Sequence, residues 1–421
     1  MNQPLVSVLI ANYNHEDTIT ETLQSVLNQT YKNMQIIVID DGSTDESWNL
    51  INQFDDSRIE AFRLEKNQHV CAATNYGMTK IKGDYVARTD SDDIWYPNKI
   101  ERQIQYMTMH KDCKVCFTWC DFIDENGVNI NDVETNRVRL HEASFSSQED
   151  AIERFYFRGN CLAHSSVVME TEVMNTVGVY DVGYNQLHDF DYWIRIAKRY
   201  PIDVIKEKCM AVRRFLNQEN RETNMSNMSE STETRVFNEY MELRAHYFED
   251  MSDELFIKAF GKYFRKKGQL NPEQLECEKA FLMCRPQDGW NGIPPAGLRR
   301  IHELLMNNKT KKILEDDYNL GIKDYYKLLG NHLYNDSILQ TKSRNMQEEN
   351  KYLIEKRNNL INEHEKLYEK IQILQEEKND LINEIELYEN STSWKMTKPL
   401  RTLGRKLKNK YKCSLLKKKC R

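Results

Sequence analysis

The sequence predicts an α/β fold with a mainly parallel sheet, followed by a helical region and a coiled coil. Over roughly the first 110 residues, short apolar runs alternate with segments of helical periodicity, as in consecutive βαβ units. The composition agrees, because 40% hydrophobic residues with only 15 Gly and 8 Pro are typical of a globular chain rather than a collagen-like one. Near the other end, a heptad pattern without Gly or Pro spans residues 346–388.

The strands and helices of the predicted sheet follow one another regularly. Residues 6–10 and 36–39 are short runs rich in Val, Ile and Leu, as expected of buried strands. Between them, residues 16–29 place four apolar side chains at helical spacing. The alternation continues with helices at 45–54 and 71–80 and strands at 59–64 and 85–87. We therefore expect this part of the chain to form βαβ units that share one sheet.

The chain is expected to have four parts. They are an α/β domain at 1–222, a helical region at 223–339, a coiled coil at 340–392 and a basic amphipathic tail at 393–421. No apolar run approaches the ~20 residues that a membrane-spanning helix needs. Residues 1–14 lack the pattern of a signal peptide, so we expect the protein in the cytoplasm.

Ten cysteines in such a chain do not indicate a disulfide framework. Cys113, Cys116 and Cys120 lie close together in a β-rich run, which raises the alternative of a zinc site. They supply three thiols and no obvious fourth ligand, so buried thiols are the favoured interpretation.

Polar clusters come directly after three of the predicted strands. They are Asn12, the pair Asp40–Asp41, and Asp90-Ser91-Asp92. Ligands of open α/β sheets bind beyond the carboxyl ends of the strands, so these clusters are expected at one edge.

Asp90 and Asp92 are candidate ligands of a divalent cation. Two carboxylates one residue apart suit Mg²⁺ or Mn²⁺, with water and ligand phosphates completing the shell, and such an ion can neutralise a departing diphosphate. Asp41 could accept hydrogen bonds from a nucleobase or a ribose hydroxyl. For both groups the alternative is structural, because Asp commonly shapes turns and caps helices.

Two further groups follow later in the chain. Asp189 precedes a helical pattern and is a candidate general base towards a hydroxyl acceptor if it faces the same crevice; otherwise it is a helix cap. Arg213 and Arg214 could contact a diphosphate or simply pair with acidic groups of the protein.

The C-terminal parts indicate association. Leu353, Leu360, Leu367, Leu374 and Leu381 recur every seven residues, which favours self-association over a solvated single helix. Residues 395–421 contain twelve basic and no acidic residues; removing them from the net charge of −6 leaves −18 for the remainder. Such a tail fits an anionic membrane surface, and nucleic acid is the less favoured alternative.

Four segments in order, 6–14, 27–31, 38–45 and 90–99, closely resemble glycosyltransferase family 2. The resemblance covers about residues 5–215 and implies a GT-A fold, a nucleotide-sugar donor, a divalent cation (Mn or Mg) and inversion at the anomeric carbon. It also implies roles for individual residues. These are nucleoside or donor binding by Ala11, Asn12, Tyr13, Asn67 and Asp41, ribose or metal contact by Asp90, metal binding by Asp92, and base catalysis by Asp189.

The sequence departs from the family pattern in several places. His188 stands where the family usually has Glu before the catalytic Asp, and His69 stands where Asn-x-Gly would place Gly. Thr74 replaces an Arg, and Arg213-Arg214-Phe215 continues without the usual Arg-x-His. The missing Gly and Arg affect the expected contacts to the diphosphate and the base, and the missing His removes an expected group near the metal. Asp41, Asp90, Asp92 and Asp189 are retained.

The resemblance implies an inverting, hexosyl-type transferase that moves a sugar to a hydroxyl of a glycan or lipid-linked acceptor. The segment 390–401 is similar to a motif at the ends of bacterial surface-polysaccharide glycosyltransferases, so we expect action at the inner face of the membrane. A UDP-sugar is the default donor. The alternative is a degenerate module that acts as a coiled-coil scaffold; a nicotinamide-binding domain is less favoured, because no G-x-G-x-x-G follows the first strand.

Overall fold

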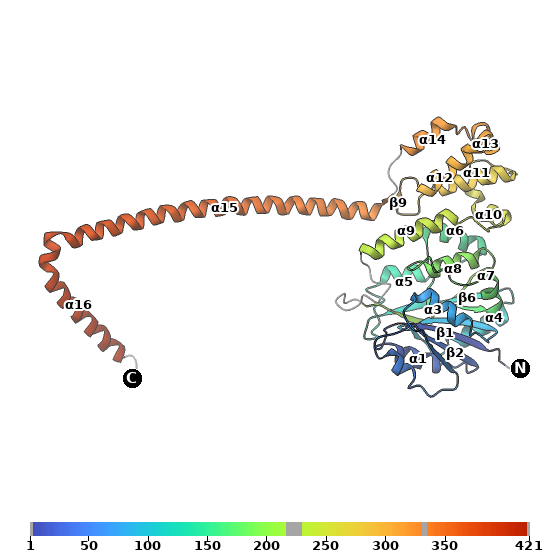
Figure 1. The fold of residues 1–421 in the computed structure, drawn as a ribbon, viewed down its shortest axis with the longest axis horizontal. Helices are drawn as coiled ribbons and strands as arrows, with labels where there is room; N and C mark the ends of the chain where they lie inside the picture. Colours follow the sequence, from blue (N-terminus) through green and yellow to red (C-terminus); the bar gives the residue numbers. More distant parts are fainter. Residues whose placement is uncertain (1–2, 216–229, 331–334, 419–421) are drawn as a thin grey trace. The chain divides into compact units, whose positions relative to one another are not determined.

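The computed structural model describes residues 3–215, 230–330 and 335–418, and the chain divides into two compact units, Met1–Ser337 and Ile338–Arg421 (Figure 1). The division near residue 337 lies close to the start expected for the coiled coil. The boundary expected between residues 222 and 223 lies outside the described residues.

The first unit is built on a mixed, mostly parallel sheet, which confirms the predicted fold class. Among the described residues the sheet has eight strands in the order β3-β2-β1-β4-β7-β6-β8-β5. Strands β1 to β4 are parallel neighbours, and β6 is parallel to β8, whereas β7 and β5 run antiparallel to their neighbours. The bounds are β1 (Val6–Asn12), β2 (Met34–Asp40), β3 (Ile59–Arg63), β4 (Tyr85–Asp90), β5 (Ile94–Trp95), β6 (Val115–Ile123), β7 (Val168–Glu170) and β8 (Asp203–Arg213).

Helices cover both faces of this sheet because its strands bury alternate side chains on opposite sides. The helices are α1 (Ile19–Leu27), α2 (Ser47–Ile51), α3 (His69–Met78), α4 (Lys99–Met109), α5 (Thr135–His141), α6 (Gln148–Arg158), α7 (Thr171–Val177) and α8 (His188–Ala197). In β2, Ile36 and Val38 enter the core beneath α1 and α4, and Ile37 and Ile39 enter the opposite core. Cys113, Cys116 and Cys120 are buried, as expected for core thiols.

The helical region is not separate from the sheet at its start. Helix α9 (Glu230–His246) and helix α10 (Asp253–Phe260) contribute Tyr240, Leu243, Phe256 and Phe260 to the same core as α6 and α8. Helices α11 (Pro272–Met283), α12 (Pro295–Met306), α13 (Asn308–Tyr318) and α14 (Ile322–Leu329) enclose a core of their own. A short sheet pairs β9 (Trp290–Asn291) with β10 (Asn335–Asp336).

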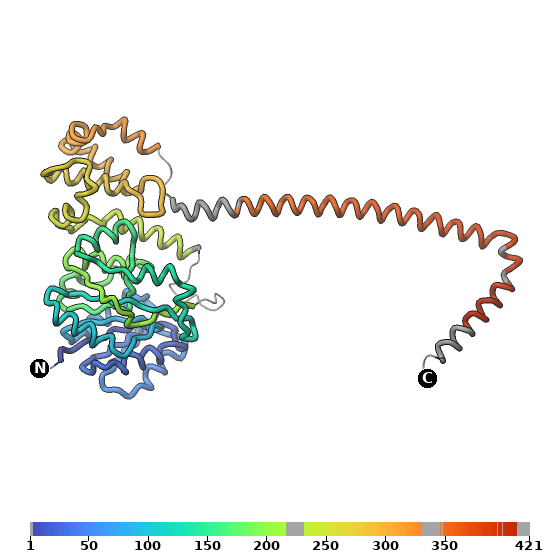
Figure 2. The backbone as a smooth tube through the Cα atoms, turned by 180° about the vertical axis from the view of Figure 1, so that it is seen from behind, coloured from blue at the N-terminus to red at the C-terminus, as the bar shows by residue number. Residues whose placement is uncertain are grey.

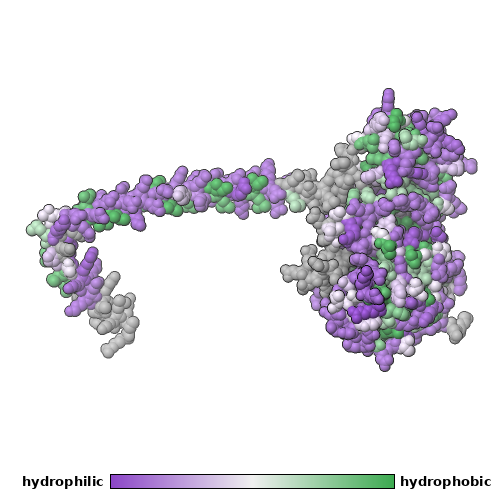
Figure 3. Space-filling view, viewed as in Figure 1, coloured by the Kyte–Doolittle hydropathy of each residue, from purple (hydrophilic) through white to green (hydrophobic). Residues whose placement is uncertain are grey.

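The second unit consists of helix. Helix α15 (Ser337–Asn390) runs for 54 residues, and α16 (Thr392–Lys418) follows after a bend (Figure 2). Apolar side chains lie exposed along α15, seen as patches among hydrophilic ones in Figure 3. Within the described ranges, the structure contains no helix with the length and hydropathy needed to span a bilayer.

Candidate donor and catalytic site

The carboxyl ends of β1, β2 and β4 lie side by side in the sheet, as the polar clusters predicted. Asn12 ends β1 and is buried; its Nδ2 donates to Asp40 Oδ2 at 3.0 Å and to Ser43 Oγ at 3.2 Å. Asp40 Oδ1 accepts the backbone N–H of Ser43 at 3.0 Å. The Asn12 and Asp40 side chains therefore hold the two loops together, which leaves Asp41 and the adjoining backbone as the groups for a ligand.

Asp41 joins this loop to the start of α3. Its backbone N–H donates to the carbonyl of Asn12 at 2.8 Å, and its Oδ1 accepts the N–H of Gln68 at 2.9 Å. Burial raises the pKa of the Asp41 carboxyl despite the N–H groups of Gln68 and His69. The carboxylate that was expected to contact the base is thus positioned by the segment that begins at Asn67.

The replacement of the family glycine by His69 has a backbone consequence. His69 has φ +68°, in the left-handed region that glycine adopts without strain. Asn67 Oδ1 accepts the His69 N–H at 2.9 Å and fixes this turn. Gly42 faces it with φ +72°, and a Cβ there would approach the Lys66 backbone to 2.8 Å. The turn keeps the shape that a glycine would give, at a conformational cost.

Asp90 is held by two groups that the sequence did not single out. Arg88, whose side chain is 3% exposed, donates from Nη1 to Asp90 Oδ1 at 2.7 Å. Ser165 Oγ donates to Asp90 Oδ2 at 3.1 Å and accepts the Asp90 N–H at 2.8 Å. Although burial opposes it, the Arg88 guanidinium lowers the pKa of Asp90. Asp90 is therefore fixed in orientation, and the Arg88 charge favours its carboxylate form.

Asp92 and Asp93 crowd the same turn with negative charge. Burial, and repulsion from Asp90, raise the pKa of Asp92, while His15 opposes this shift. Burial and repulsion from Asp92 and Asp90 raise the pKa of Asp93 well above its ordinary value. His15 is itself fixed, because its Nδ1 lies 2.6 Å from Ser91 Oγ.

These carboxyl groups fit a divalent cation that is shared with a ligand. A cation would relieve the repulsion, and carboxylate oxygens are the donors that Mg²⁺ and Mn²⁺ accept. The described residues contain no group of three or more His, Cys, Asp or Glu arranged around one metal position. Asp92, with Asp90 beside it, would supply part of the shell, and donor phosphates and water the rest.

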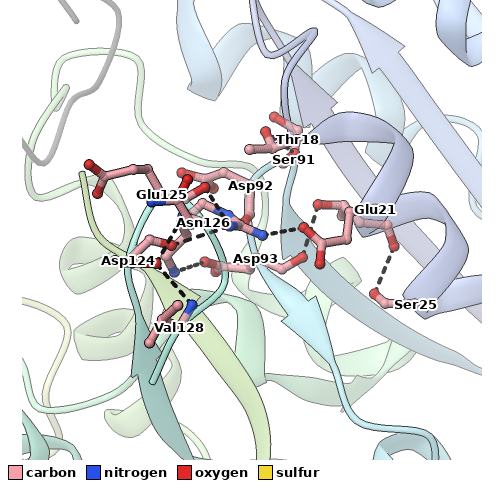
Figure 4. Close-up of polar contacts among 12 residues, drawn as sticks. Thr18, Glu21, Ser25, Ser91, Asp92, Asp93, Asp124, Glu125, Asn126 and Val128 are labelled. Carbon is pink, nitrogen blue, oxygen red and sulfur yellow. Dashed lines mark hydrogen bonds and ion pairs between the residues drawn. The ribbon is translucent and has the colours of Figure 1, made fainter. Parts of the chain in front are cut away.

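Arg213 of β8 braces the acidic turn, whose Asp92 and Asp93 lie between Glu21 and the loop of Asp124 and Glu125 in Figure 4. Its Nε donates to the Asp92 carbonyl at 2.9 Å, and its Nη1 donates to the carbonyls of Asp124 and Glu125 at 3.2 and 3.1 Å. Its Nη2 pairs with Glu21 at 2.5 Å. The Arg213 guanidinium is thus already engaged, so the diphosphate contact predicted for it would compete with these bonds.

Arg214 differs from its neighbour. It is half-buried, and its Nε has no hydrogen-bond partner among the described residues. Burial lowers the pKa of Arg214, and Asp92 acts on it in the opposite direction. Of the two arginines, Arg214 is the better placed for the predicted diphosphate contact.

Asp189 lies in the first turn of α8, which begins at His188 rather than a few residues later. Its Oδ2 accepts from Asn160 Nδ2 at 2.8 Å and its Oδ1 from the Phe190 N–H at 2.6 Å. Burial raises the pKa of Asp189, and Arg88 is among the groups that oppose the rise. Arg88, which is hydrogen-bonded to Asp90, thus acts electrostatically on the predicted base as well as on a predicted metal ligand.

A glutamate of the helical region holds the loop that precedes Asp189. The buried Glu239 of α9 accepts three backbone N–H groups, from Asn185 at 2.9 Å and from Gln186 and Leu187 at 2.8 Å. His188 Nδ1 lies 2.9 Å from the Asn185 carbonyl, so this nitrogen carries the hydrogen. Helix α9 thereby contributes to the site, although its sequence indicated no chemistry.

The parallel strands, the polar loops at their carboxyl ends and the acidic turn after β4 define a GT-A-like α/β fold of the nucleotide-sugar-dependent glycosyltransferases. A family model described as glycosyl transferase family 2 matches residues 7–168. An uncharacterized glycosyltransferase of Methanocaldococcus jannaschii is 32% identical over 212 residues, which cover 49% of this chain and 70% of that protein. The chain belongs to glycosyltransferase family 2.

Other relatives extend the comparison. The Escherichia coli UDP-Glc:alpha-D-GlcNAc-diphosphoundecaprenol beta-1,3-glucosyltransferase WfaP is 34% identical over 197 residues, covering 46% of this chain and 71% of WfaP. The putative teichuronic acid biosynthesis glycosyltransferase TuaG of Bacillus subtilis is 29% identical over 217 residues, covering 51% and 81%. Residues 1–349 of S. aureus TarS with UDP-GlcNAc superpose with a TM-score of 0.48 and 16% identity, over 71% of this chain and 84% of that one. The predicted family, fold class and enzyme class are confirmed.

Proposed function

We propose that this protein transfers a sugar from a UDP-sugar to a hydroxyl of a glycan or lipid-linked acceptor, with inversion, during synthesis of a surface polysaccharide. The observation that carries this proposal is that the buried Arg88, which is hydrogen-bonded to Asp90, also acts electrostatically on Asp189. The names of two relatives support the substrates: WfaP is named for a UDP-Glc donor and a diphosphoundecaprenol-linked acceptor, and TuaG for teichuronic acid biosynthesis.

The proposed reaction is a single displacement. The acceptor oxygen attacks the anomeric carbon opposite the nucleotide, the bond from that carbon to the diphosphate oxygen breaks, and the hydroxyl proton passes to the Asp189 carboxylate. The raised pKa of Asp189 makes it a stronger base than a solvated aspartate. A divalent cation at Asp92, when bound, would offset the charge that develops on the departing diphosphate. Arg214 would add a positive charge from the chain itself.

The C-terminal unit supports attachment to an anionic membrane and self-association, which we include in the proposal. Met396, Leu400, Leu403 and Leu407 are exposed and share one face of α16 among basic residues. Each basic residue near an anionic surface contributes about 1 kcal/mol at most, so several together would hold the protein reversibly at the inner leaflet.

The test combines donor binding with analysis of the product. Thermal unfolding with UDP-, GDP-, dTDP- and CMP-sugars, with and without Mn²⁺, should show stabilisation by one nucleotide that needs the metal and is lost in Asp92→Asn. Asp189→Asn should keep that stabilisation and lose transfer, whereas Asp112→Asn, at an exposed turn, should keep both. NMR of the anomeric proton of the product should show inversion.

Three outcomes of this experiment would each contradict a different part of the proposed function. Stabilisation by no nucleotide-sugar would favour the scaffold alternative. Transfer that persists in Asp189→Asn would place the base elsewhere, and a product with retained configuration would exclude the single displacement.

A further inference from the structure

Helix α15 carries its apolar side chains at heptad positions d and e. With the leucine series at position d, the apolar residues of position e lie on the other side of position a, which is largely polar. Position d comprises Met346, Leu353, Leu360, Leu367, Leu374, Leu381 and Tyr388; position e includes Ile354, Ile361, Tyr368 and Ile382; position a comprises Asn350, Arg357, His364, Ile371, Lys378 and Ile385. The apolar members of this stripe are 43% to 67% exposed in the single chain, so the stripe has no cover of its own.

A parallel pairing of two copies would fit this pattern poorly. In a parallel coiled coil in register, each core position meets the same position of its partner. Arg357 would then face the partner's Arg357, and Lys378 the partner's Lys378, which places like charges in the core. Position g would face position e, so the charged g residues would meet Ile and Tyr and form no ion pairs.

Reversing one helix removes these conflicts. Position a then faces position d, position e faces e, and position g faces g. In one register Arg357 lies opposite the partner's Leu374, and Lys378 lies opposite the partner's Leu353. The same register sets His364 opposite the partner's Leu367. The stems of Arg357 and Lys378 can each pack along the leucine that they meet.

The charges at position g select this register. Position g comprises Glu349, Lys356, Glu363, Lys370, Glu377 and Glu384. Lys356 then faces the partner's Glu377, and Glu363 faces the partner's Lys370; twofold symmetry repeats both ion pairs. The like-charged pair of Glu349 with the partner's Glu384 is confined to the ends. Sliding one helix along its partner by one heptad would bring Lys356 opposite the partner's Lys370. Sliding it the other way would bring Glu363 opposite the partner's Glu377. Either shift therefore places like charges together.

We propose that α15 pairs with α15 of a second copy as an antiparallel, twofold-symmetric coiled coil in this register. The inference specifies the direction of the self-association included in the proposed function and rests on it. The overlap from residue 346 to residue 385 corresponds to about 60 Å of paired helix, with the apolar d and e positions of both copies enclosed.

The test uses single cysteines in the full-length protein. Cys413→Ser and Cys420→Ser first remove the tail thiols, and this background serves as the control. Leu353→Cys and Lys378→Cys are then prepared as two proteins and oxidised separately and after mixing. We expect a disulfide-linked dimer in the mixture alone. In the antiparallel pair, position 353 of one copy lies roughly 37 Å along the helix axis from position 353 of the other, beyond the ~7 Å Cα separation that a disulfide tolerates.

Each other result overturns the proposal in a recognisable way. A dimer linked through Leu353→Cys alone would indicate a parallel coil. A dimeric mass without cross-linking in the mixture would exclude the register, and a trimeric or tetrameric mass would exclude the twofold pair. A mass of one chain, 50.1 kDa, would refute self-association itself, while donor binding and transfer, measured separately, would still decide the enzymatic proposal.

A charge exchange provides an independent check. Lys356→Glu should weaken the dimer about tenfold, because two attractive pairs become repulsive. Adding Glu377→Lys should restore affinity, since the pair is regenerated with reversed signs. Glu355→Lys, at the outward position f, should have little effect. Failure of the double variant to recover would overturn the g-to-g pairing.

Discussion

Replacing Glu239 with glutamine would test whether helix α9 positions the loop that leads to the catalytic aspartate. The two carboxylate oxygens of Glu239 accept three backbone N–H groups, two of them at a single oxygen. Glutamine keeps one oxygen and presents an NH₂ group to at least one N–H. Two donors would then face each other at a buried position, and the loop must move or lose a bond.

The expected loss of stability follows from the number of hydrogen bonds that Glu239→Gln alters. A hydrogen bond to a charged group contributes about 1.5–3 kcal/mol, so the loss of one bond, with two more made to a neutral oxygen, should cost about 2–3 kcal/mol. For a large domain this corresponds to a fall in Tm of about 4–6 °C. Displacement of a catalytic group by ~1 Å can reduce a rate about 100-fold, so we expect kcat to fall at least tenfold. The KM for the donor should change little, because none of its predicted contacts lies in the segment 185–187.

The assay is thermal unfolding together with steady-state transfer kinetics. Glu242→Gln is the matched control, because Glu242 lies three residues further along α9, is exposed and pairs with His246. A fall in Tm with unchanged kcat would show that Glu239 stabilises the fold without positioning Asp189. An unchanged Tm would refute the hydrogen-bond argument itself.

Three further predictions follow from the site. His69→Gly should raise the free energy of unfolding by about 1 kcal/mol, because glycine adopts φ +68° without the penalty of a side chain; urea denaturation measures this, and a loss of stability would mean that the His69 side chain contributes more than its backbone costs. Arg213→Lys should lower the free energy of unfolding by about 2–4 kcal/mol, because an ammonium cannot reach three carbonyls and Glu21 from one position; a stability close to that of the unaltered protein would show that the brace is dispensable. The transfer rate should fall with decreasing pH through an apparent pKa above 3.8, because Asp189 must be ionised to accept a proton and burial raises its pKa; an acid limb at or below 3.8 in a pH–rate profile would exclude the raised pKa.

Local periodicity predicts the parallel strands of the sheet. The polar residues that follow these strands predict that Asp41, Asp90 and Asp92 lie at their carboxyl ends. Residues 36–39 form a buried strand because branched apolar side chains enter both cores. Asp41 is predicted as a ligand contact because ligands of such sheets bind where the strands end. Each of these inferences depends on residues close together in the sequence.

The supporting residues depend on contacts that the sequence does not encode locally. Arg88 is one charged residue within a strand, and nothing near it in the sequence indicates that its charge acts on Asp189. Ser165 reaches Asp90 across 75 positions, and Glu239 reaches Asn185 across 54. Glu239 can be recognised as a support of the loop before Asp189 only when the packing of α9 on the sheet core is known.

The packing of α9 and α10 determines where the chain can be shortened. Tyr156 of α6 lies within 5.4 Å, ring centre to ring centre, of Tyr247, Phe248 and Phe260, and its hydroxyl donates to the carbonyl of Leu282. A fragment ending at residue 222 would retain every acid of the site and yet expose this aromatic cluster to water, which favours aggregation over folding. A fragment ending near residue 337 keeps the cluster covered and omits only the long helices. Expression of the catalytic part by itself should therefore begin from that longer boundary.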